Sequence, residues 1–105
     1  MLIGTYIGNF QGVEQKLDIR TVNESQKTLA GKLTEQGKEH DISGLYKFVN
    51  NRFIVEFSIN KPEDYAGSWQ LLSDQAVETL QGLNSRVSSK DDIAYWEASF
   101  KKLNG

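Results

Sequence analysis

The residues that could do chemistry are few, and the most suggestive group surrounds the single histidine. His40 lies between two carboxylates in the run Glu39–Asp41. A histidine with carboxylates can act as an acid–base pair or bind a metal ion. Because successive residues of a strand face opposite sides, His40 shares a face with neither neighbour unless the strand is distorted. We therefore expect structural or solvated roles for these side chains.

Other catalytic patterns are missing from the sequence. The chain has no cysteine, which excludes thiolate metal sites and cysteine nucleophiles. Paired carboxylates can act in hydrolysis, but the doublets Glu63–Asp64 and Asp91–Asp92 fall in expected loops, where we assign them no catalytic role. The sequence shows no glycine-rich phosphate loop, no Ser–His–Asp arrangement and no metal-ligand spacing. It predicts a protein that is not an enzyme and needs no cofactor or metal.

The charges nearly balance, with 12 basic and 14 acidic side chains and a net charge of -2. This leaves no electrostatic surplus for binding nucleic acid or acidic membranes, so neither is an expected partner. The uncharged stretch Met1–Val13 is shorter than the roughly 20 residues of a membrane span, and no basic residue precedes it as in a secretory signal. We expect one domain over residues 1–105, located in the cytoplasm.

Apolar and polar residues alternate along most of the chain, which is typical of strands with one buried and one exposed face. The clearest case is Arg52–Asn60, where Phe53, Val55, Phe57 and Ile59 share one face. The same pattern predicts eight strands, near Leu2–Phe10, Glu14–Val22, Thr28–Glu35, Glu39–Val49, Arg52–Asn60, Asp64–Leu72, Ala76–Val87 and Ile93–Leu103.

Short connections determine how these strands join. Gln36–Lys38 and Asn50–Asn51 are typical of tight hairpin turns, since Gly and Asn tolerate the positive φ that such turns require. Short turns favour an antiparallel up-and-down order, and eight such strands can close into a barrel that has no exposed edge. We therefore predict an all-β, eight-stranded antiparallel up-and-down β-barrel, related in shape to the lipocalins.

Glycine recurs in a fixed context on four of the expected strands. An inward glycine leaves room that bulky side chains of neighbouring strands can fill. The four segments are Leu2-x-Gly4-x-Tyr6, Leu29-x-Gly31-x-Leu33, Ile42-x-Gly44-x-Tyr46 and the variant Tyr65-x-Gly67-x-Trp69. In order and spacing they resemble the avidin and streptavidin family, whose first, third and fourth strands carry such motifs. Tyr65-x-Gly67 is similar to that family's Trp-x-Gly, and Trp96 falls near its tryptophan before the last strand.

The resemblance implies a biotin pocket, but the residues that would bind biotin differ here. The family uses an Asn, a Ser and a Tyr as partners of the ureido oxygen, and this chain has Gly8, Val13 and Leu33 instead. Each unsatisfied buried polar atom costs roughly 1–3 kcal/mol. Phe57, Tyr65 and Gln81 also stand where the family has tryptophans. We therefore expect biotin to bind weakly at best.

A set of inward aromatic residues is the candidate ligand site. These rings either fill the core or wall an apolar pocket in which Gln81 is a polar group. The candidate ligand-binding residues are Tyr46, Phe57, Tyr65, Trp69, Gln81 and Trp96.

A second set lies on the opposite face of the middle strands. Leu45, Val49 and Ile54 alternate with the expected inward residues Tyr46, Phe48, Phe53 and Phe57. They would form an apolar outer patch suited to a homo-oligomer contact, as in the avidin family.

The leading hypothesis is a non-catalytic binding module that holds an apolar or aromatic small molecule or a peptide at the barrel mouth. The alternative is a structural or protein-interaction barrel with a filled core that self-associates through its outer face. An enzyme ranks third, and the three differ in whether a cavity, an interface or clustered titratable groups are present.

Overall fold

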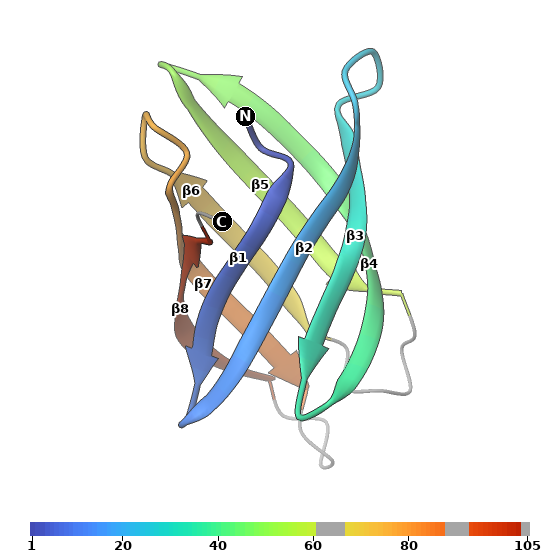
Figure 1. Ribbon diagram of the computed structural model, residues 1–105, viewed down its shortest axis with the longest axis vertical. Helices are drawn as coiled ribbons and strands as arrows, with labels where there is room; N and C mark the ends of the chain where they lie inside the picture. Colours follow the sequence, from blue (N-terminus) through green and yellow to red (C-terminus); the bar gives the residue numbers. More distant parts are fainter. Residues whose placement is uncertain (61–66, 88–92, 104–105) are drawn as a thin grey trace.

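The computed structural model is an eight-stranded antiparallel barrel, in agreement with the sequence-based prediction (Figure 1). It describes residues 1–60, 67–87 and 93–103. Each strand pairs with the next along the chain, and β8 returns to pair with β1. The strands are β1 (Gly4–Phe10), β2 (Val13–Asn23), β3 (Thr28–Glu35), β4 (Lys38–Val49), β5 (Arg52–Ile59), β6 (Ser68–Ser73), β7 (Thr79–Val87) and β8 (Ile93–Lys102).

Tight turns join β3 to β4 and β4 to β5, as the sequence predicts. The β3–β4 turn has positive φ at Gln36 (51°) and Gly37 (75°), and the β4–β5 turn has positive φ at Asn50 (53°) and Asn51 (65°). Two successive positive φ values define the turn type that matches the twist of a hairpin. These turns fix the register of their strands, for example Phe48 opposite Phe53.

The β6–β7 connection differs from the prediction. We expected a strand from Asp64 and another from Ala76, whereas β6 is described from Ser68 and β7 begins at Thr79; residues 64–66 lie outside the described residues. The Asp74 carboxylate accepts hydrogen bonds from the backbone N–H groups of Glu78 (2.7 Å) and Thr79 (3.1 Å). These two hydrogen bonds satisfy backbone N–H groups that could otherwise pair with a neighbouring strand. The segment between β6 and β7 therefore forms a turn.

Side chains fill the barrel interior. Leu17, Leu33 and Leu80 have no exposed surface, and the Tyr6 hydroxyl donates a hydrogen bond to the Leu2 carbonyl at 2.7 Å. Burial, with a smaller contribution from the charge of Asp74, raises the pKa of Tyr6 to about 12. The whole apolar core comprises Leu2, Tyr6, Leu17, Ile19, Leu29, Leu33, Ile42, Tyr46, Val55, Phe57, Trp69, Leu71, Val77, Leu80, Ala98 and Phe100.

The recurring glycines let neighbouring backbones approach each other. A Cβ at Gly31 would lie 1.8 Å from the Asp18 carbonyl oxygen, and one at Gly44 would lie 1.8 Å from the Glu56 carbonyl oxygen. The sequence predicts instead that bulky side chains fill this space, and that holds at Gly4, where a Cβ would lie 2.6 Å from the Lys102 side chain. At Gly31 and Gly44 the absent side chain makes room for the next strand itself.

Phe48 corrects the expected inward set. Its side chain is 55% exposed although it has inward parity, and its ring packs on half-buried Phe53 at 4.9 Å between centroids. The β4–β5 hairpin extends beyond the end of the barrel, where the inner face meets solvent (Figure 1). Alternation predicts which face of a strand a residue lies on. It does not predict whether the strand extends beyond the other strands of the barrel at that residue.

Candidate functional site

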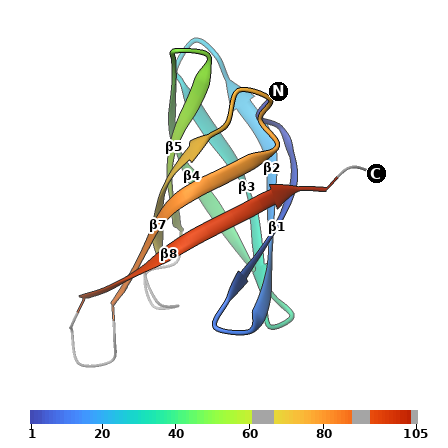
Figure 2. The ribbon, with the colours of Figure 1, turned by 90° about the vertical axis from the view of Figure 1, so that its left-hand side faces the viewer.

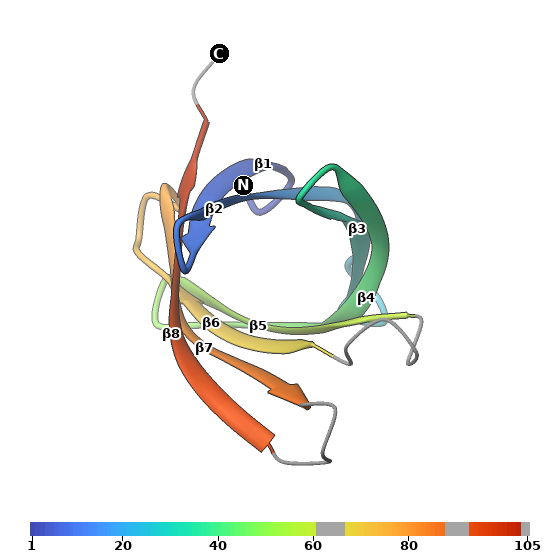
Figure 3. The same ribbon diagram turned by 90° about the horizontal axis from the view of Figure 1, so that it is seen from below.

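The strongest candidate site is a pocket at one end of the barrel, the end viewed in Figure 3. It has a volume of about 530 Å³ and lies beside the β1–β2 and β3–β4 turns and the adjoining parts of β7 and β8. A volume of this size falls within the roughly 300–1,000 Å³ usual for small-molecule sites. We call it the mouth pocket; it is lined by Phe10, Gln11, Val13, Glu35, Gln36, Arg86, Val87 and Trp96.

A partly buried ion pair lies in the mouth pocket. Arg86 binds Glu35 through two hydrogen bonds, from Nη2 to Oε1 at 2.6 Å and from Nη1 to Oε2 at 3.2 Å. Their side chains are 14% and 20% exposed. Arg86 Nε donates to the Asn84 side-chain oxygen at 2.9 Å, and the Gln15 amide donates to Glu35 Oε1 at 2.8 Å. The result is a polar network that spans the barrel from β2 and β3 to β7.

This network controls the protonation of Glu35. Burial alone raises the pKa of that carboxyl, but hydrogen bonds from Arg86 and Gln15, and the charges of Arg86 and His40, hold it below its usual range. Glu35 is therefore ionised at neutral pH and balances the charge of Arg86. Three of the five guanidinium N–H groups are used in the contacts above, which leaves two that donate to none of the described residues.

Aromatic rings surround the guanidinium. Its central carbon lies 4.0 Å from the centroid of Phe10 and 5.8 Å from that of Trp69. Phe10 also meets Trp96 edge to face, with 5.2 Å between centroids. Such contacts hold the planar guanidinium in one orientation. The mouth pocket therefore combines apolar walls with a rigid, internally neutralised polar pair.

Trp69 lies deeper and has an unsatisfied group. Its ring stacks on Phe57 with 5.1 Å between centroids and an interplanar angle of 13°. Its indole Nε1 is buried and has no hydrogen-bond partner within residues 1–60, 67–87 and 93–103. A buried donor left unpaired costs roughly 1–3 kcal/mol.

The structure brings together only part of the predicted site. Phe57, Trp69 and Trp96 lie toward the mouth pocket, where Trp96 is a lining residue. Tyr46 is in the core but near the other end, where its backbone N–H binds the carbonyl of Lys27 beside the β2–β3 turn. Tyr65 lies outside the described residues.

Gln81 is a correction to the predicted interior position. It is exposed, and its amide contacts the Ser99 hydroxyl at 3.5 Å on the outer face. The alternation of β7 places Leu80 and Asn84 inside, so Gln81, of opposite parity to both, points outward. The resemblance to the avidin family places a tryptophan at this position, and a one-residue difference in alignment reverses the face.

The polar network itself was not predicted. Gln15 and Glu35 have the same parity as the core residues Leu17 and Leu33, and Arg86 has that of Leu80. Polar residues on the inner face near strand ends are therefore the sequence signal that was available. Among the described residues, no group of three or more His, Asp and Glu side chains is placed to hold a metal ion. Glu39 and Asp41 are exposed and His40 is half-buried, as alternation predicts.

The comparisons with known proteins support the fold. No family model matches the chain, and no curated protein matches it. A solved structure, the crystal structure of core-bradavidin, is similar over 92% of this chain and 97% of its own, with a TM-score of 0.72 and 20% sequence identity. The chain therefore has an avidin-like barrel fold, which confirms the predicted architecture. In the described part of the chain, no helix is long and apolar enough to span a membrane.

Proposed function

We propose that this protein is a non-catalytic binding module that holds a small apolar or aromatic ligand in the mouth pocket. The observation that carries the proposal is the pairing of Phe10 and Trp96 walls with the Arg86–Glu35 network in one concave site. Apolar pockets with a few fixed polar groups are the usual form of small-molecule sites. The avidin-like fold supports a binding role without identifying the ligand.

The electrostatics of the mouth pocket favour a neutral ligand. Glu35 and Arg86 neutralise each other, so a charged ligand would gain no net attraction and would lose hydration on entry. An amide-like group can accept from the remaining Arg86 donors and donate to Glu35. The ligand class we propose is therefore an aromatic ring bearing a neutral amide or urea group.

Isothermal titration calorimetry with 2-naphthamide and indole-3-acetamide tests this proposal. Both probes should bind the unmodified protein, and Trp96→Ala should weaken binding about tenfold because an aromatic wall is lost. Arg86→Met should also weaken binding by removing the hydrogen-bond donor. Gln81→Ala, on the outer face, is the matched control and should leave affinity unchanged.

Two results would contradict the proposal. One is no measurable heat for either probe at millimolar concentration. The other is equal loss of affinity in Gln81→Ala and Trp96→Ala, because only Trp96 lines the mouth pocket.

A second candidate function, self-association, is favoured by the outer apolar patch. Leu45, Val49 and Ile54 are 54%, 47% and 41% exposed, and Ile54 pairs across the strands with Leu72, itself 43% exposed. Leu45 and Ile54 also line an outer groove of about 500 Å³. Adjacent exposed apolar residues of this kind are typical of protein contact surfaces. We propose that this patch is where two copies of the chain meet.

A further inference from the structure

The seam that closes the barrel is short and leaves part of β8 without a neighbour. β1 pairs with β8 only at Tyr6–Lys102, Ile7–Lys101 and Gly8–Phe100. The segment Ile93–Ala98 pairs with β7 on one side and with no described strand on the other. Figures 2 and 3 show this half of β8 running away from β1. The expectation that closure leaves no exposed edge therefore fails here.

Hydrogen bonds at the C-terminal end of β8 show which backbone groups face the open side. The Lys102 N–H donates to the Glu78 carbonyl on the β7 side at 2.7 Å, and the Leu103 N–H donates to the Thr5 carbonyl on the β1 side at 2.8 Å. Residues of an antiparallel strand alternate between these two directions. Counting back by twos from Leu103, the residues whose backbone N–H and C=O groups face the open side are Ile93, Tyr95 and Glu97.

The side chains along this edge are unusually apolar for an exposed strand. Ile93 is 60% exposed and Tyr95 is 67% exposed, and Leu83, opposite Glu97 on β7, is 48% exposed. Natural edges are commonly protected by lysine, proline or bulges. The segment Ile93–Ala98 contains neither lysine nor proline, and its only charge is Glu97.

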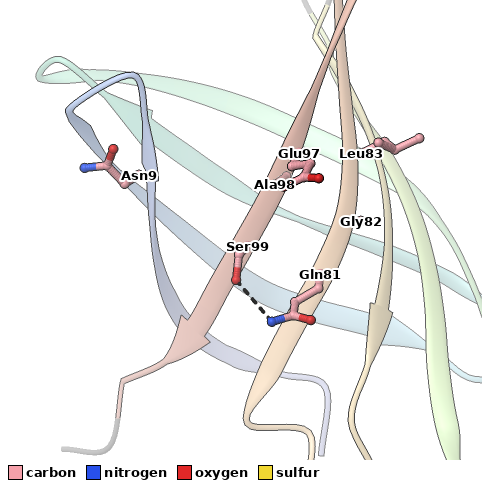
Figure 4. Close-up of a pocket in the computed structure, with 7 residues that line it drawn as sticks. All are labelled: Asn9, Gln81, Gly82, Leu83, Glu97, Ala98 and Ser99. Atoms are coloured by element: carbon pink, nitrogen blue, oxygen red, sulfur yellow. Dashed lines mark hydrogen bonds between the residues drawn. The ribbon is translucent and has the colours of Figure 1, made fainter.

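A cleft lies on the outer face of β7 and β8 and reaches Asn9 of β1, near where β1 and β8 separate (Figure 4). Its volume is about 670 Å³, and Asn9 of β1 lies across from Glu97, Ala98 and Ser99 of β8. Figure 4 shows Asn9 on a ribbon well apart from the one that carries Glu97 and Ser99. Beyond Gly8, β1 no longer pairs with β8. The cleft therefore leaves space for an added strand beside β8.

We propose that the open edge of β8 binds an extended peptide segment of a partner protein by strand addition. The segment runs antiparallel to β8, receives backbone hydrogen bonds at Ile93, Tyr95 and Glu97, and carries a basic side chain opposite Glu97 and apolar side chains opposite Tyr95 and Ile93. Main-chain bonds supply affinity in this mode, and alternate side chains supply specificity. The proposed site uses the outward residues Tyr95 and Glu97 of β8, whereas Trp96 between them lines the mouth pocket, and the proposal goes beyond the proposed function.

The probe is a fluorescein-labelled, C-terminally amidated peptide of sequence SKTVTIT, followed by fluorescence anisotropy. Its Lys, Val and Ile fall opposite Glu97, Tyr95 and Ile93. We expect a dissociation constant below about 1 mM. Methylating the backbone nitrogens of Lys, Val and Ile removes the donors that face β8 and should weaken binding more than tenfold. Methylating the second and third Thr nitrogens, which face away from β8, should weaken it much less.

Protein variants give an independent test. Tyr95→Pro removes an edge donor without removing a bond to β7 and should reduce affinity about tenfold. Glu97→Lys should weaken SKTVTIT binding about threefold to fivefold and strengthen binding of SETVTIT. Glu24→Lys, an exposed change in the β2–β3 turn, is the charge control. Circular dichroism confirms that each variant is folded, and Arg86→Met should leave peptide binding unchanged.

Three outcomes would overturn the proposal. The first is no binding of SKTVTIT at 1 mM. The second is equal affinity of the two methylated peptides, because the edge would then not be the site. The third is self-association, by sedimentation, that Tyr95→Pro abolishes, because the occupant would then be a second copy of this chain. The calorimetry of the mouth pocket is unaffected by any of these, so the two proposals fail separately.

Discussion

At the scale of single residues, Glu35 links the mouth pocket to the stability of the barrel. Its carboxylate is held by Arg86 and Gln15, and its pKa lies below the usual range. A carboxyl whose pKa is lower in the folded than in the unfolded state stabilises the fold above the unfolded pKa of about 4.3. That contribution is lost as the pH falls through the lower, folded value.

Glu35→Gln should therefore reduce the dependence of the free energy of unfolding on acidic pH. At pH 7 we expect a loss of about 2 kcal/mol in the free energy of unfolding, since Arg86 loses its charged partner. The variant and the unmodified protein should converge only as the pH falls below the lowered pKa of Glu35, where the native carboxylate is protonated as well. Urea denaturation between pH 3 and pH 7 measures this, with Glu24→Gln as the exposed control. A constant difference across the whole range would contradict the role given to Glu35.

At the scale of elements, glycine sets how closely neighbouring strands approach. Gly44 lies against the backbone of β5, whereas Gly12, in the β1–β2 turn, has open space around it and a φ of 84°. The cost of a methyl group therefore has a different origin at each position. At Gly44 it is steric, and at Gly12 it is conformational.

Gly44→Ala should destabilise the barrel by about 3 kcal/mol, because the new Cβ would overlap the Glu56 carbonyl oxygen and force β4 and β5 apart. Gly12→Ala should cost about 1 kcal/mol, for the left-handed conformation alone. Urea denaturation at neutral pH compares the two. Equal losses would contradict the larger, steric cost assigned to Gly44.

Much of this element structure was predictable from the sequence, for identifiable reasons. Strict alternation in Arg52–Asn60 and two-residue turns such as Asn50–Asn51 determine strand faces and hairpin registers locally. The length of the β1–β8 seam was not predictable, because it depends on how two strands far apart in the sequence diverge in space. For the same reason alternation alone could not show that Arg86, on β7, meets Glu35, on β3.

At the scale of the whole molecule, the outer patch concerns assembly. Ile54 lies near its centre, next to Leu72 and on the same groove as Leu45. Burial of such a patch contributes roughly 25 cal/mol per Å² before the entropic cost of association. A two-fold contact also places each residue near its own copy or its close neighbours.

We expect sedimentation at tens of micromolar to show a dimer or tetramer, and Ile54→Glu to yield monomer by placing buried charges in the contact. Gln70→Glu, an exposed polar position on the neighbouring strand β6, is the matched charge control. An unmodified protein that is monomeric would contradict the proposed contact. An oligomer unaffected by Ile54→Glu would show that the copies meet through a different surface.

The avidin-like fold raises the question of biotin binding. The residues expected to bind the biotin ureido oxygen are replaced in this chain. Leu33 is fully buried in the core, Gly8 is covered by Phe100, and Val13 is a wall of the mouth pocket. None of these side chains donates a hydrogen bond. Calorimetry should therefore give a biotin dissociation constant no tighter than micromolar, and nanomolar affinity would show that other residues have taken over the role.

The mouth pocket as a ligand site is tested most directly by amide and indole NMR spectra recorded during a titration with 2-naphthamide. The largest shift changes should centre on Phe10, Val13, Glu35 and the Trp96 indole, which share the pocket. Changes at Leu45 and Ile54 of the outer groove should be small. Shift changes centred on the outer groove or the β8 edge, or none at saturating probe, would contradict the account.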